Sequence, residues 1–467
     1  MTITAPTIWI FFPILLGGSL AFVRNRKFLS YFSSTVAVLL ALMAQFVPID
    51  KALPIGGISL KISPSFAILG RALTIASTEG ALLTLIYGGA ALWFFGSLAI
   101  YNTTQIAPLG FIVIGLLVAS VAVQPFLYAA LFIQLAILIS VPMLVSLSQP
   151  PGKGVLRFLI YQTLAMPFIL MAGWLLAGVE ASPGDLALAV QAASMLGLGF
   201  AFLLAIFPLY SWIPMLMEDS HPFIVGFLLW ILPTMALIFL TGFLDRYSWL
   251  RTSPQLAFAL RAAGLLMIVS GGFWAALERH LGRIMAFGVI AETGFSLLAL
   301  SLNTSAGILI LFLLIPARTL TSALWSFGLS VIRNRVKTMR FSDVRGVLYD
   351  APLAGAAIVL ATLSTGAFPL LAGFPPRLAL WQNLASVSSS AALWMGIGIL
   401  GLLMGAIRSL AAMSITEEFT GWSSQESLPQ RLILGLGMLG LFILGTFPRS
   451  AQFFLSDLPL MFERLGR

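Results

Sequence analysis

The chain has 467 residues, of which 60% are hydrophobic and 9% are charged, and its mean hydropathy is +1.03. Soluble domains carry about a quarter charged residues, so this composition excludes a soluble protein and indicates a polytopic membrane protein. There is no cysteine and there are only two histidines, His221 and His280. Disulfides and thiolate or iron–sulfur sites are therefore excluded, and any redox cofactor is expected on a partner.

The net charge of +9 does not indicate nucleic-acid binding. Most of the cations lie in short loops between apolar spans, where Lys and Arg set the orientation of a protein in the membrane. We therefore expect the lipid bilayer and other membrane proteins, and no nucleic acid, as partners.

Membrane-spanning helices need about 17 to 25 mostly apolar residues. The first such span, Ile8 to Val23, is followed by Arg24, Arg26 and Lys27, and this order indicates an uncleaved helix because a signal peptide carries its charges in front. The same rule predicts about fourteen spans in all. They lie near residues 7–23, 30–48, 81–100, 107–123, 125–148, 155–178, 187–212, 222–243, 255–276, 284–302, 306–332, 352–386, 391–413 and 431–449.

A single all-α integral membrane domain over residues 1–467 accounts for this pattern. We expect three N-terminal helices in residues 1–100, a first group of helices in 107–243, a second in 255–413, and a last helix with a C-terminal tail in 431–467. The segment from Pro54 to Gly80 is either an external excursion or an extra helix.

The cations predict an orientation. If odd-numbered connections are cytoplasmic, those connections hold twelve Lys or Arg residues and the even-numbered ones hold five, so the N- and C-termini are expected outside. The loop from Arg333 to Arg345 also suits anionic lipid or a partner, although an orientation signal explains it more simply. The twelve are Arg24, Arg26, Lys27, Lys153, Arg157, Arg279, Arg283, Arg333, Arg335, Lys337, Arg340 and Arg345, and the five are Lys51, Lys61, Arg71, Arg246 and Arg251.

Span twelve contains the most informative stretch, LSTGAFPLLAGFPPRLALW, from Leu363 to Trp381. Prolines remove backbone donors and disrupt the preceding turn, so we expect a helix break whose freed carbonyls face other helices or a wet cavity. A cation beside such a break is expensive in lipid and must be paired or near a helix end. The break residues are Pro369, Gly373, Pro375 and Pro376, and the cation is Arg377.

A second proline-broken span lies five spans earlier, in FPLYSWIP, with Pro208 and Pro214. Paired interruptions in corresponding helices are typical of inverted repeats, and an odd offset inverts orientation. We therefore expect spans 4–8 and 9–13 to form two inverted five-helix repeats with broken helices 7 and 12. Two unrelated proline kinks are the alternative.

Three blocks of sequence resemble one family. They are FPLYSWIPMLMEDSHPFIVGF, GGFWAALERHLGRIMAFGVIAETGFSLLAL and DVRGVLYDAPLAGAAIVLATLSTGAFPLLAGFPPRLALW. Together they are similar to the antiporter-like membrane subunits of respiratory complex I and the Mrp-type cation/proton antiporters, most like the chain N type of NADH:quinone oxidoreductase. The matching positions include Pro208, Trp212, Pro214 and Pro222 in the first block and Arg283, Ala286, Ile290 and Gly294 in the second.

The departures from this family are as informative as the matches. Members that move protons carry a glutamate in span 5 and lysines in spans 7 and 8, and the aligned positions here are Gln134, Leu203 and Leu232, none of which ionises. The resemblance therefore implies a first half-channel without proton carriers. The family's motif histidine and aspartate correspond to Tyr210 and Met215, and its second-half basic positions correspond to Gly282, Arg318, Ser322 and Arg377.

Five residues are candidates for a proton path or for shaping its field. Arginine keeps its proton, so Arg318 and Arg377 can affect a proton path only through their charge. The alternative is that both are buried cations whose N–H groups are satisfied by carbonyls at the helix break. Glu292 lies mid-span and is either in a static ion pair with Arg318 or a titrating group facing water.

The other candidates lie in the first half. Glu218, with its neighbours Asp219 and His221, either gates an entrance or belongs to a solvated loop with helix-capping acids. Gln134 is expected to make an interhelical hydrogen bond.

Three functions fit these residues. The chain is a membrane-arm subunit of a complex I-like, redox-driven proton-translocating complex with one working half-channel, a non-conducting spacer subunit of such a complex, or an Mrp-like cation/proton antiporter subunit. In each case the resemblance implies a bacterial inner membrane, other membrane subunits as partners, and quinone and redox cofactors on those subunits. No catalytic residue for redox chemistry is assigned to this chain.

Overall fold

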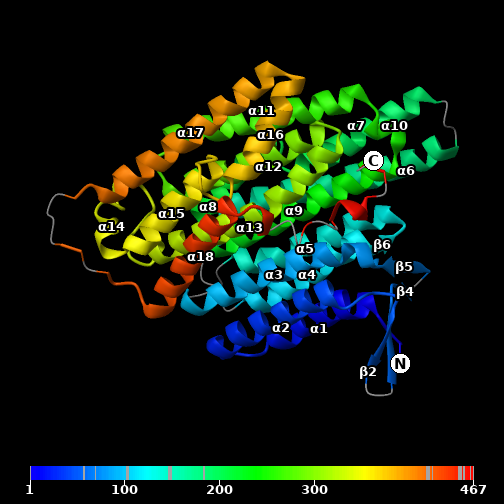
Figure 1. The fold of residues 1–467 in the computed structure, drawn as a ribbon, viewed down its shortest axis with the longest axis horizontal. Helices are drawn as coiled ribbons and strands as arrows, with labels where there is room; N and C mark the ends of the chain where they lie inside the picture. Colours follow the sequence, from blue (N-terminus) through cyan, green and yellow to red (C-terminus); the bar gives the residue numbers. More distant parts are fainter. Residues whose placement is uncertain are drawn as a thin grey trace.

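The structure is a computed structural model that describes the chain except for residues 1, 56–57, 69, 101–104, 146–149, 182–184, 417–420, 423, 451–454, 456–457, 463 and 466–467. Helices run side by side along one direction, with short strands gathered at one end (Figure 1). Within the described ranges, eleven helices are long and apolar enough to cross a membrane. The prediction of an all-α polytopic membrane protein is confirmed at this level.

The first hundred and fifty residues form the lower layer in Figure 1. This part contains a π-helical turn η1 (Thr7–Phe11) that leads into α1 (Phe12–Leu20), and then α2 (Arg26–Phe46), α3 (Gly80–Gly96), α4 (Ile106–Ala122) and α5 (Ala129–Leu144). Short 3-10 turns η2 (Ser77–Glu79), η3 (Ser97–Ala99) and η4 (Phe126–Tyr128) flank these helices.

The remaining helices form the upper layers. They are α6 (Lys153–Ala181), α7 (Leu186–Leu203), the turn η5 (Leu209–Ser211), α8 (Trp212–Asp219), α9 (Pro222–Arg246), α10 (Ser248–Arg251), α11 (Pro254–Leu277), α12 (Leu281–Ser301) and α13 (Ser305–Arg333). After these come α14 (Val347–Asp350), α15 (Pro352–Thr365), α16 (Phe374–Val387), α17 (Ser389–Ser414), α18 (Leu428–Thr446) and the turn η6 (Leu458–Met461).

The segment between α2 and α3 is built of strands. β1 (Thr2–Thr4) pairs in parallel with β3 (Ile58–Ser63), which pairs antiparallel with β2 (Ala52–Ile55). A second sheet contains β4 (Ser65–Ile68), β5 (Arg71–Thr74) and β6 (Val123–Gln124) in that order. Of the two alternatives for the segment from Pro54 to Gly80, the extra helix is therefore wrong, because these short segments satisfy their backbone groups by pairing with β1 and β6 instead.

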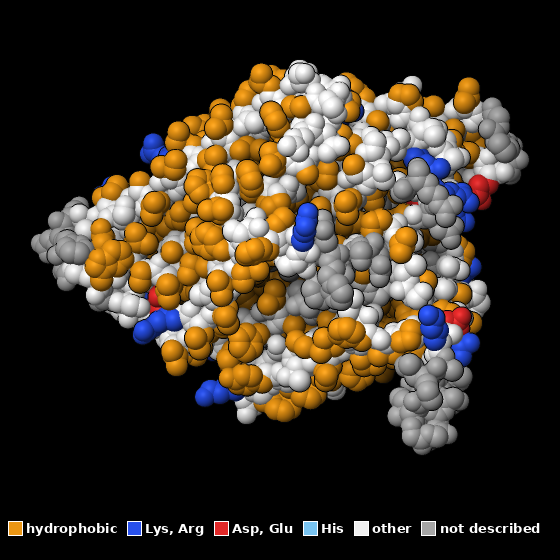
Figure 2. Space-filling model, viewed as in Figure 1, with side chains coloured by type: hydrophobic (Ala, Val, Ile, Leu, Met, Phe, Trp, Pro, Cys, Tyr) orange, Lys and Arg blue, Asp and Glu red, His pale blue; other side chains and the backbone are white. Residues whose placement is uncertain are grey.

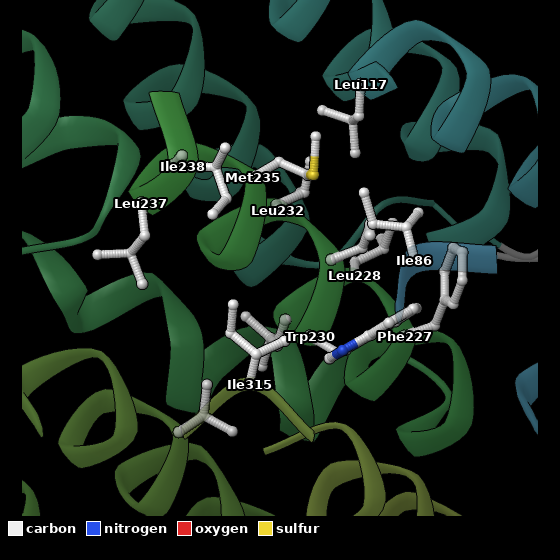
Figure 3. Packing of buried hydrophobic residues seen from close by; sticks show 14 of the residues in the cluster. Ile86, Leu117, Phe227, Leu228, Trp230, Leu232, Met235, Leu237, Ile238 and Ile315 are labelled. Atoms are coloured by element: carbon white, nitrogen blue, oxygen red, sulfur yellow. The ribbon is translucent and has the colours of Figure 1, made fainter. Parts of the chain in front are cut away.

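Three helices form the centre of the bundle. The apolar windows of α9 and α12 are entirely buried, and that of α13 is 72% buried. Figure 3 shows Trp230, Leu232 and Met235 of α9 packed among side chains from α3, α4 and α13. The one polar atom of Trp230, its ring Nε1, donates to Thr319 Oγ1 of α13 at 2.8 Å, so this large side chain is buried without an unsatisfied donor.

Small residues let the outer helices approach this centre. A Cβ on Gly264 of α11 would lie 2.8 Å from the carbonyl oxygen of Gly294 of α12, and one on Gly294 would lie 2.7 Å from the carbonyl of Gly264. Close approach through glycine is the usual way in which helices gain contact in lipid, where there is no hydrophobic drive between them. The pair fixes α11 against α12, the helix that carries Glu292.

Candidate functional site

Helix α15 ends at Thr365, and the backbone is not helical again until α16 begins at Phe374. The end of α15 has a Schellman hydrogen-bond pattern: Ala367 N donates to Ser364 O at 3.1 Å and Phe368 N donates to Leu363 O at 3.0 Å. Ala367 adopts the left-handed conformation that this motif needs, with φ of 53°. The backbone itself therefore terminates α15 in mid-bundle.

Helix α7 ends in the same way. Ala205, with φ of 50°, donates from its N to Phe202 O at 3.3 Å, and Ile206 N donates to Ala201 O at 2.9 Å. Both breaks thus place an alanine at the left-handed position, where glycine is the usual residue. We call residues 204–211 the front break and residues 366–373 the rear break.

The prolines of the two breaks lie between helices or in the first turn of a helix, where a backbone N–H would have no intrahelical acceptor. Pro208 follows the end of α7 and precedes η5, whereas Pro214 lies in the first turn of α8. Pro369 lies within the rear break, and Pro375 and Pro376 occupy the first turn of α16, where their missing donors leave no helical bond unmade.

Arg377 lies one turn into α16, and its side chain is only 1% exposed. Its Nη1 donates to Ser364 O at 2.9 Å, and its Nη2 forms an ion pair with Oε1 of Glu292 on α12. The guanidinium also lies 4.7 Å from the centre of the Phe295 ring, within the range of a cation–π contact. Arg377 therefore ties the broken end of α15 to the buried centre of the bundle.

Ser364 and Gly373 complete this connection. Ser364 Oγ accepts from Gly373 N at 3.1 Å and lies 3.1 Å from Thr321 Oγ1 of α13. A Cβ at Gly373 would collide with both the Ser364 carbonyl and Arg377 Nη1. Only glycine therefore allows the two sides of the rear break to come this close.

Arg318 lies beside this pair on α13 and is 3% exposed. Its Nη2 donates to Thr293 Oγ1 at 3.4 Å, a long hydrogen bond, and Glu292 pairs with Arg377 instead. The predicted alternative of a static Glu292–Arg318 pair is therefore wrong, because the rear break brings Arg377 closer. The buried cluster contains two guanidinium groups and one carboxyl group, and Oε2 of Glu292 has no hydrogen-bond partner among the residues that the structure describes.

The front break is surrounded by neutral groups. Gln162 of α6 donates from Nε2 to Leu203 O at 3.2 Å and to Phe202 O at 3.4 Å. Gln134 of α5 donates to Thr163 Oγ1 at 3.0 Å, which is the interhelical bond expected for it. Leu203 and Leu232 are buried hydrocarbon.

A small cavity lies against the front break, and Thr293 of α12 reaches it from the other side. Its volume of about 10 Å³ holds at most one water, since a water needs roughly 10–15 Å³ on this measure. Helix α12 thus lies between the two breaks: Thr293 lines the cavity at the front break and also accepts from Arg318, and Glu292 pairs with Arg377 at the rear break.

Glu218, Asp219 and His221 lie at one end of the bundle, away from this cluster. Asp219 Oδ2 accepts from Gly154 N at 2.6 Å, and Glu218 is exposed. His221 caps α9, with its Nδ1 accepting from Phe223 N at 3.3 Å. Burial and then the nearby charge of Arg333 lower the pKa of His221 from 6.5 to about 4, so the imidazole is neutral and can accept this bond.

His280 caps the N-terminus of α12 in the same way. Its Nδ1 accepts from Arg283 N at 3.3 Å, and burial lowers its pKa below the ordinary value. Within the described ranges, no three His, Asp or Glu side chains gather closely enough to hold a metal ion.

Four contributors to the site were missed in the sequence. Ser364 and Phe295 surround Arg377, whereas Gln162 and Thr163 serve the front break. Gln162 is a polar residue in a predicted apolar span, and the cost of burying an unpaired amide was a usable signal. The others are ordinary helix residues whose importance depends on contacts far away in the chain.

These observations define a polytopic helical membrane protein with two broken helices and a buried charged cluster at one of them. The sequence profile of the family described as "NADH:quinone oxidoreductase/Mrp antiporter, TM" matches residues 175–405. This profile covers just under half of the chain, which is similar to the antiporter-like membrane subunit family of respiratory complex I and the Mrp-type cation/proton antiporters.

Curated relatives are distant. The chain is 25% identical over 344 residues to the NAD(P)H-quinone oxidoreductase chain 4 1 of Synechococcus sp. (strain JA-2-3B'a(2-13)), covering 67% of this chain and 64% of that one. It is also 25% identical over 313 residues to the NADH-quinone oxidoreductase subunit N of Geobacter metallireducens, covering 64% and 66%. The matched region therefore spans less than two thirds of either relative.

The fold is matched over almost the whole chain by solved structures. A chain of respiratory complex I from Thermus thermophilus with bound NADH superposes with a TM-score of 0.77 at 18% identity, covering 99% of this chain and all of that one. A chain of the Mrp complex from Dietzia sp. DQ12-45-1b gives 0.78 at 14% identity, covering 98% and 97%. At these identities the likeness shows the fold alone.

Proposed function

We propose that this chain is a membrane-arm antiporter-like subunit of a complex I-like, redox-driven proton-translocating complex in which the front half carries no protons. The single observation that supports this most strongly is the contrast between the two breaks: neutral Gln162 serves one, and the buried Arg377–Glu292 pair serves the other. The partners are other membrane subunits, as in the multi-subunit complexes whose chains share this fold. Quinone and redox cofactors belong to those partners.

The finer topology is part of the proposal. Among the described residues, the eleven long helices and three shorter apolar ones together supply the fourteen spans that we propose. The shorter ones are Thr7–Leu20, Ile106–Ala122 and Pro352–Thr365. The matched endings of α7 and α15 support inverted repeats of spans 4–8 and 9–13. The two chain ends lie toward the end of the bundle that carries the strands (Figure 1), as an even number of crossings requires. We place this end outside a bacterial inner membrane because the cation-rich connections lie at the other.

Three features support a silent front half. The groups at Gln134, Leu203 and Leu232 cannot ionise, the one cavity beside the front break that we describe holds about one water, and Gln162 satisfies the freed carbonyls with a neutral amide. Proton relay needs groups with two accessible protonation states joined by water or short hydrogen bonds. The side chains of Gln134, Leu203 and Leu232 do not have two such protonation states.

Glu292 is the proton carrier that we propose for the rear half. It is 4% exposed, its Oε1 is bound to Arg377, and its Oε2 has no hydrogen-bond partner within the described ranges. Arg318 and Arg377 keep their charge and set the electric field around it. We do not assign a redox step to this chain.

A non-conducting spacer is the second candidate, and one observation favours it. Arg377 contacts the Ser364 carbonyl on one side and Glu292 on the other, which is the geometry of a purely structural ion pair. An Mrp-like cation/proton antiporter subunit is the third, supported by the fold shared with the Mrp complex chain.

Glu292→Gln in the assembled complex tests the proposal. Gln keeps the shape and an acceptor for Arg377, so we expect normal abundance of the complex and a reduced number of protons moved per electron in sealed vesicles. The matched controls are exposed Glu180→Gln and front-half Gln134→Leu, which should leave this ratio unchanged. Unchanged proton movement in Glu292→Gln would remove Glu292 from the path and support the spacer. Isolation of the chain as a lone monomer in mild detergent would contradict both.

A further inference from the structure

A groove on the lipid-facing surface runs between α3 and α18. Leu92 and Phe95 of α3 form one wall, Ile433 and Leu436 of α18 form the other, and Phe327 of α13 lies in the floor. Its volume is about 150 Å³, and every residue that lines it is apolar. Helix α18 has the least buried apolar window of the eleven long spans, 17%, so one wall of the groove faces lipid directly.

The size of the groove decides what it can hold. A helix with its side chains is about 10–12 Å across, and pockets for drug-sized ligands measure roughly 300–1,000 Å³. A cavity of about 150 Å³ is too small for either and suits one narrow hydrocarbon chain. Because no polar side chain lines it, we expect the polar part of the ligand to lie beyond its end.

One end of the groove opens beside the turn η3. Gln430 of α18 donates from Nε2 to Ala99 O at 3.1 Å, and Arg26 of α2 donates to Ser97 O at 3.3 Å. The starts of α2 and α18 therefore meet at this turn, directly beyond Phe95 in the groove wall. The residues that follow them, Lys27 and Arg431, are exposed.

The charges at this end are suited to an anion. Figure 2 shows Lys and Arg side chains at the edge where α2 and α18 begin, next to a hydrophobic surface. Arg431 Nε donates to the backbone carbonyl of Glu426, whereas the Glu426 carboxylate is turned inward and accepts from Ala354 N at 2.7 Å. Arg431 therefore keeps its charge without a carboxylate partner among the ion pairs of the described residues.

We propose that this groove binds an anionic glycerophospholipid. One acyl chain lies between α3 and α18, and the phosphate lies at the end of the groove near Lys27 and Arg431. Each cation near the membrane surface is worth about a fivefold gain in binding of an anionic lipid. The site is separate from both breaks, so it does not depend on the proposed proton path.

Photolabelling of the full chain in bilayer nanodiscs tests this proposal. The discs contain phosphatidylcholine with a small share of phosphatidylglycerol that carries a diazirine in one acyl chain, and labelled peptides are found by mass spectrometry. We expect label in α3, α13 and α18. Lys27→Gln and Arg431→Gln should each reduce it about fivefold, whereas Arg449→Gln, an exposed cation at the opposite end of α18, should leave it unchanged.

A second variant tests the groove itself. Ala323→Phe places a ring into the groove and should remove the label, with folding checked by thermal unfolding. Gly435→Leu adds similar bulk to α18 where nothing lies within 4 Å, so it should keep the label. Equal labelling by diazirine phosphatidylcholine, or label that neither the charge variants nor Ala323→Phe reduce, would overturn the proposal. Loss of label in the assembled complex would assign the groove to a partner subunit and overturn it too.

Discussion

The front and rear breaks share a backbone and differ in what satisfies it. Both helices end in a Schellman motif with an alanine in the left-handed conformation, Ala205 and Ala367. The carbonyl at the same point of the motif, Phe202 O or Ser364 O, accepts a further hydrogen bond from a side chain. That side chain is a neutral amide at the front break and a guanidinium paired with a carboxylate at the rear.

The helix break and the charged cluster are therefore separate features of the molecule. The break arises from the backbone and its prolines, so it persists whether or not an ionisable residue is near. The charged cluster depends on Arg377, Glu292 and Arg318, which lie on three different helices. Variants of the two breaks should therefore differ in their loss of stability, and three such changes, together with one at His221 in the front half, test the comparison.

Gly373→Ala should have the largest effect. The added Cβ collides with the Ser364 carbonyl and with Arg377, and backbone on one side of the contact cannot move away as a flexible side chain does. We expect loss of the ion pair and of more than about 3–5 kcal/mol of stability, seen as little folded protein or a much lower unfolding temperature in detergent. Gly396→Ala in α17, which meets nothing within 4 Å, is the control and should be neutral.

Arg377→Met should cost about 3–5 kcal/mol, because Glu292 is left buried without its partner. Adding Glu292→Leu should restore part of this loss, since the unpaired carboxylate is removed while the guanidinium of Arg318 stays buried beside it. Thermal unfolding at pH 7 measures both variants. If the double variant is no more stable than Arg377→Met alone, the pair does not account for the loss.

His221 should make the front half sensitive to acid. Its folded pKa, about 4, lies below its ordinary value of 6.5, so the unfolded chain binds more protons as pH falls between these values, and stability falls with it. The full loss of stability is about 3 kcal/mol. His221→Asn keeps a capping acceptor without a titrating group, so its unfolding temperature should vary less between pH 7 and pH 4. Equal pH dependence in both proteins would contradict this.

Gln162→Leu should have the smallest effect, about 1–3 kcal/mol, because it leaves the Leu203 carbonyl without its side-chain donor but leaves no charge unpaired. Gln134→Leu, which loses a single interhelical hydrogen bond of about 0.6 kcal/mol, is the matched comparison. If Gln162→Leu loses as much stability as Arg377→Met, the front break depends on the Gln162 side chain as strongly as the rear break depends on that of Arg377.

The helical membrane architecture was predictable because it depends on local composition. Apolar stretches of the required length predict helices wherever they occur, and the prolines indicated where spans 7 and 12 lose intrahelical donors. The strands between Ala52 and Thr74 were not predicted, since their pairing with β1 and β6 depends on segments that lie elsewhere in the chain.

The partners in the charged cluster were harder to predict for the same reason. Arg377 and Glu292 are 85 residues apart, and nothing in the local sequence of either indicates that the rear break turns the guanidinium toward α12 rather than leaving Glu292 to Arg318. Ser364 contributes through its backbone carbonyl, which any residue would supply. The chemical identity of the cluster was therefore visible in the sequence, and its pairing was not.

The two Schellman endings have a consequence for engineering. Because each helix stops through main-chain bonds and one left-handed residue, we expect the helix ends themselves to form whichever neutral side chains lie beside the front break. A lysine grafted at Leu203, together with a glutamate at Gln134, would test whether the front half moves protons once it carries ionisable groups.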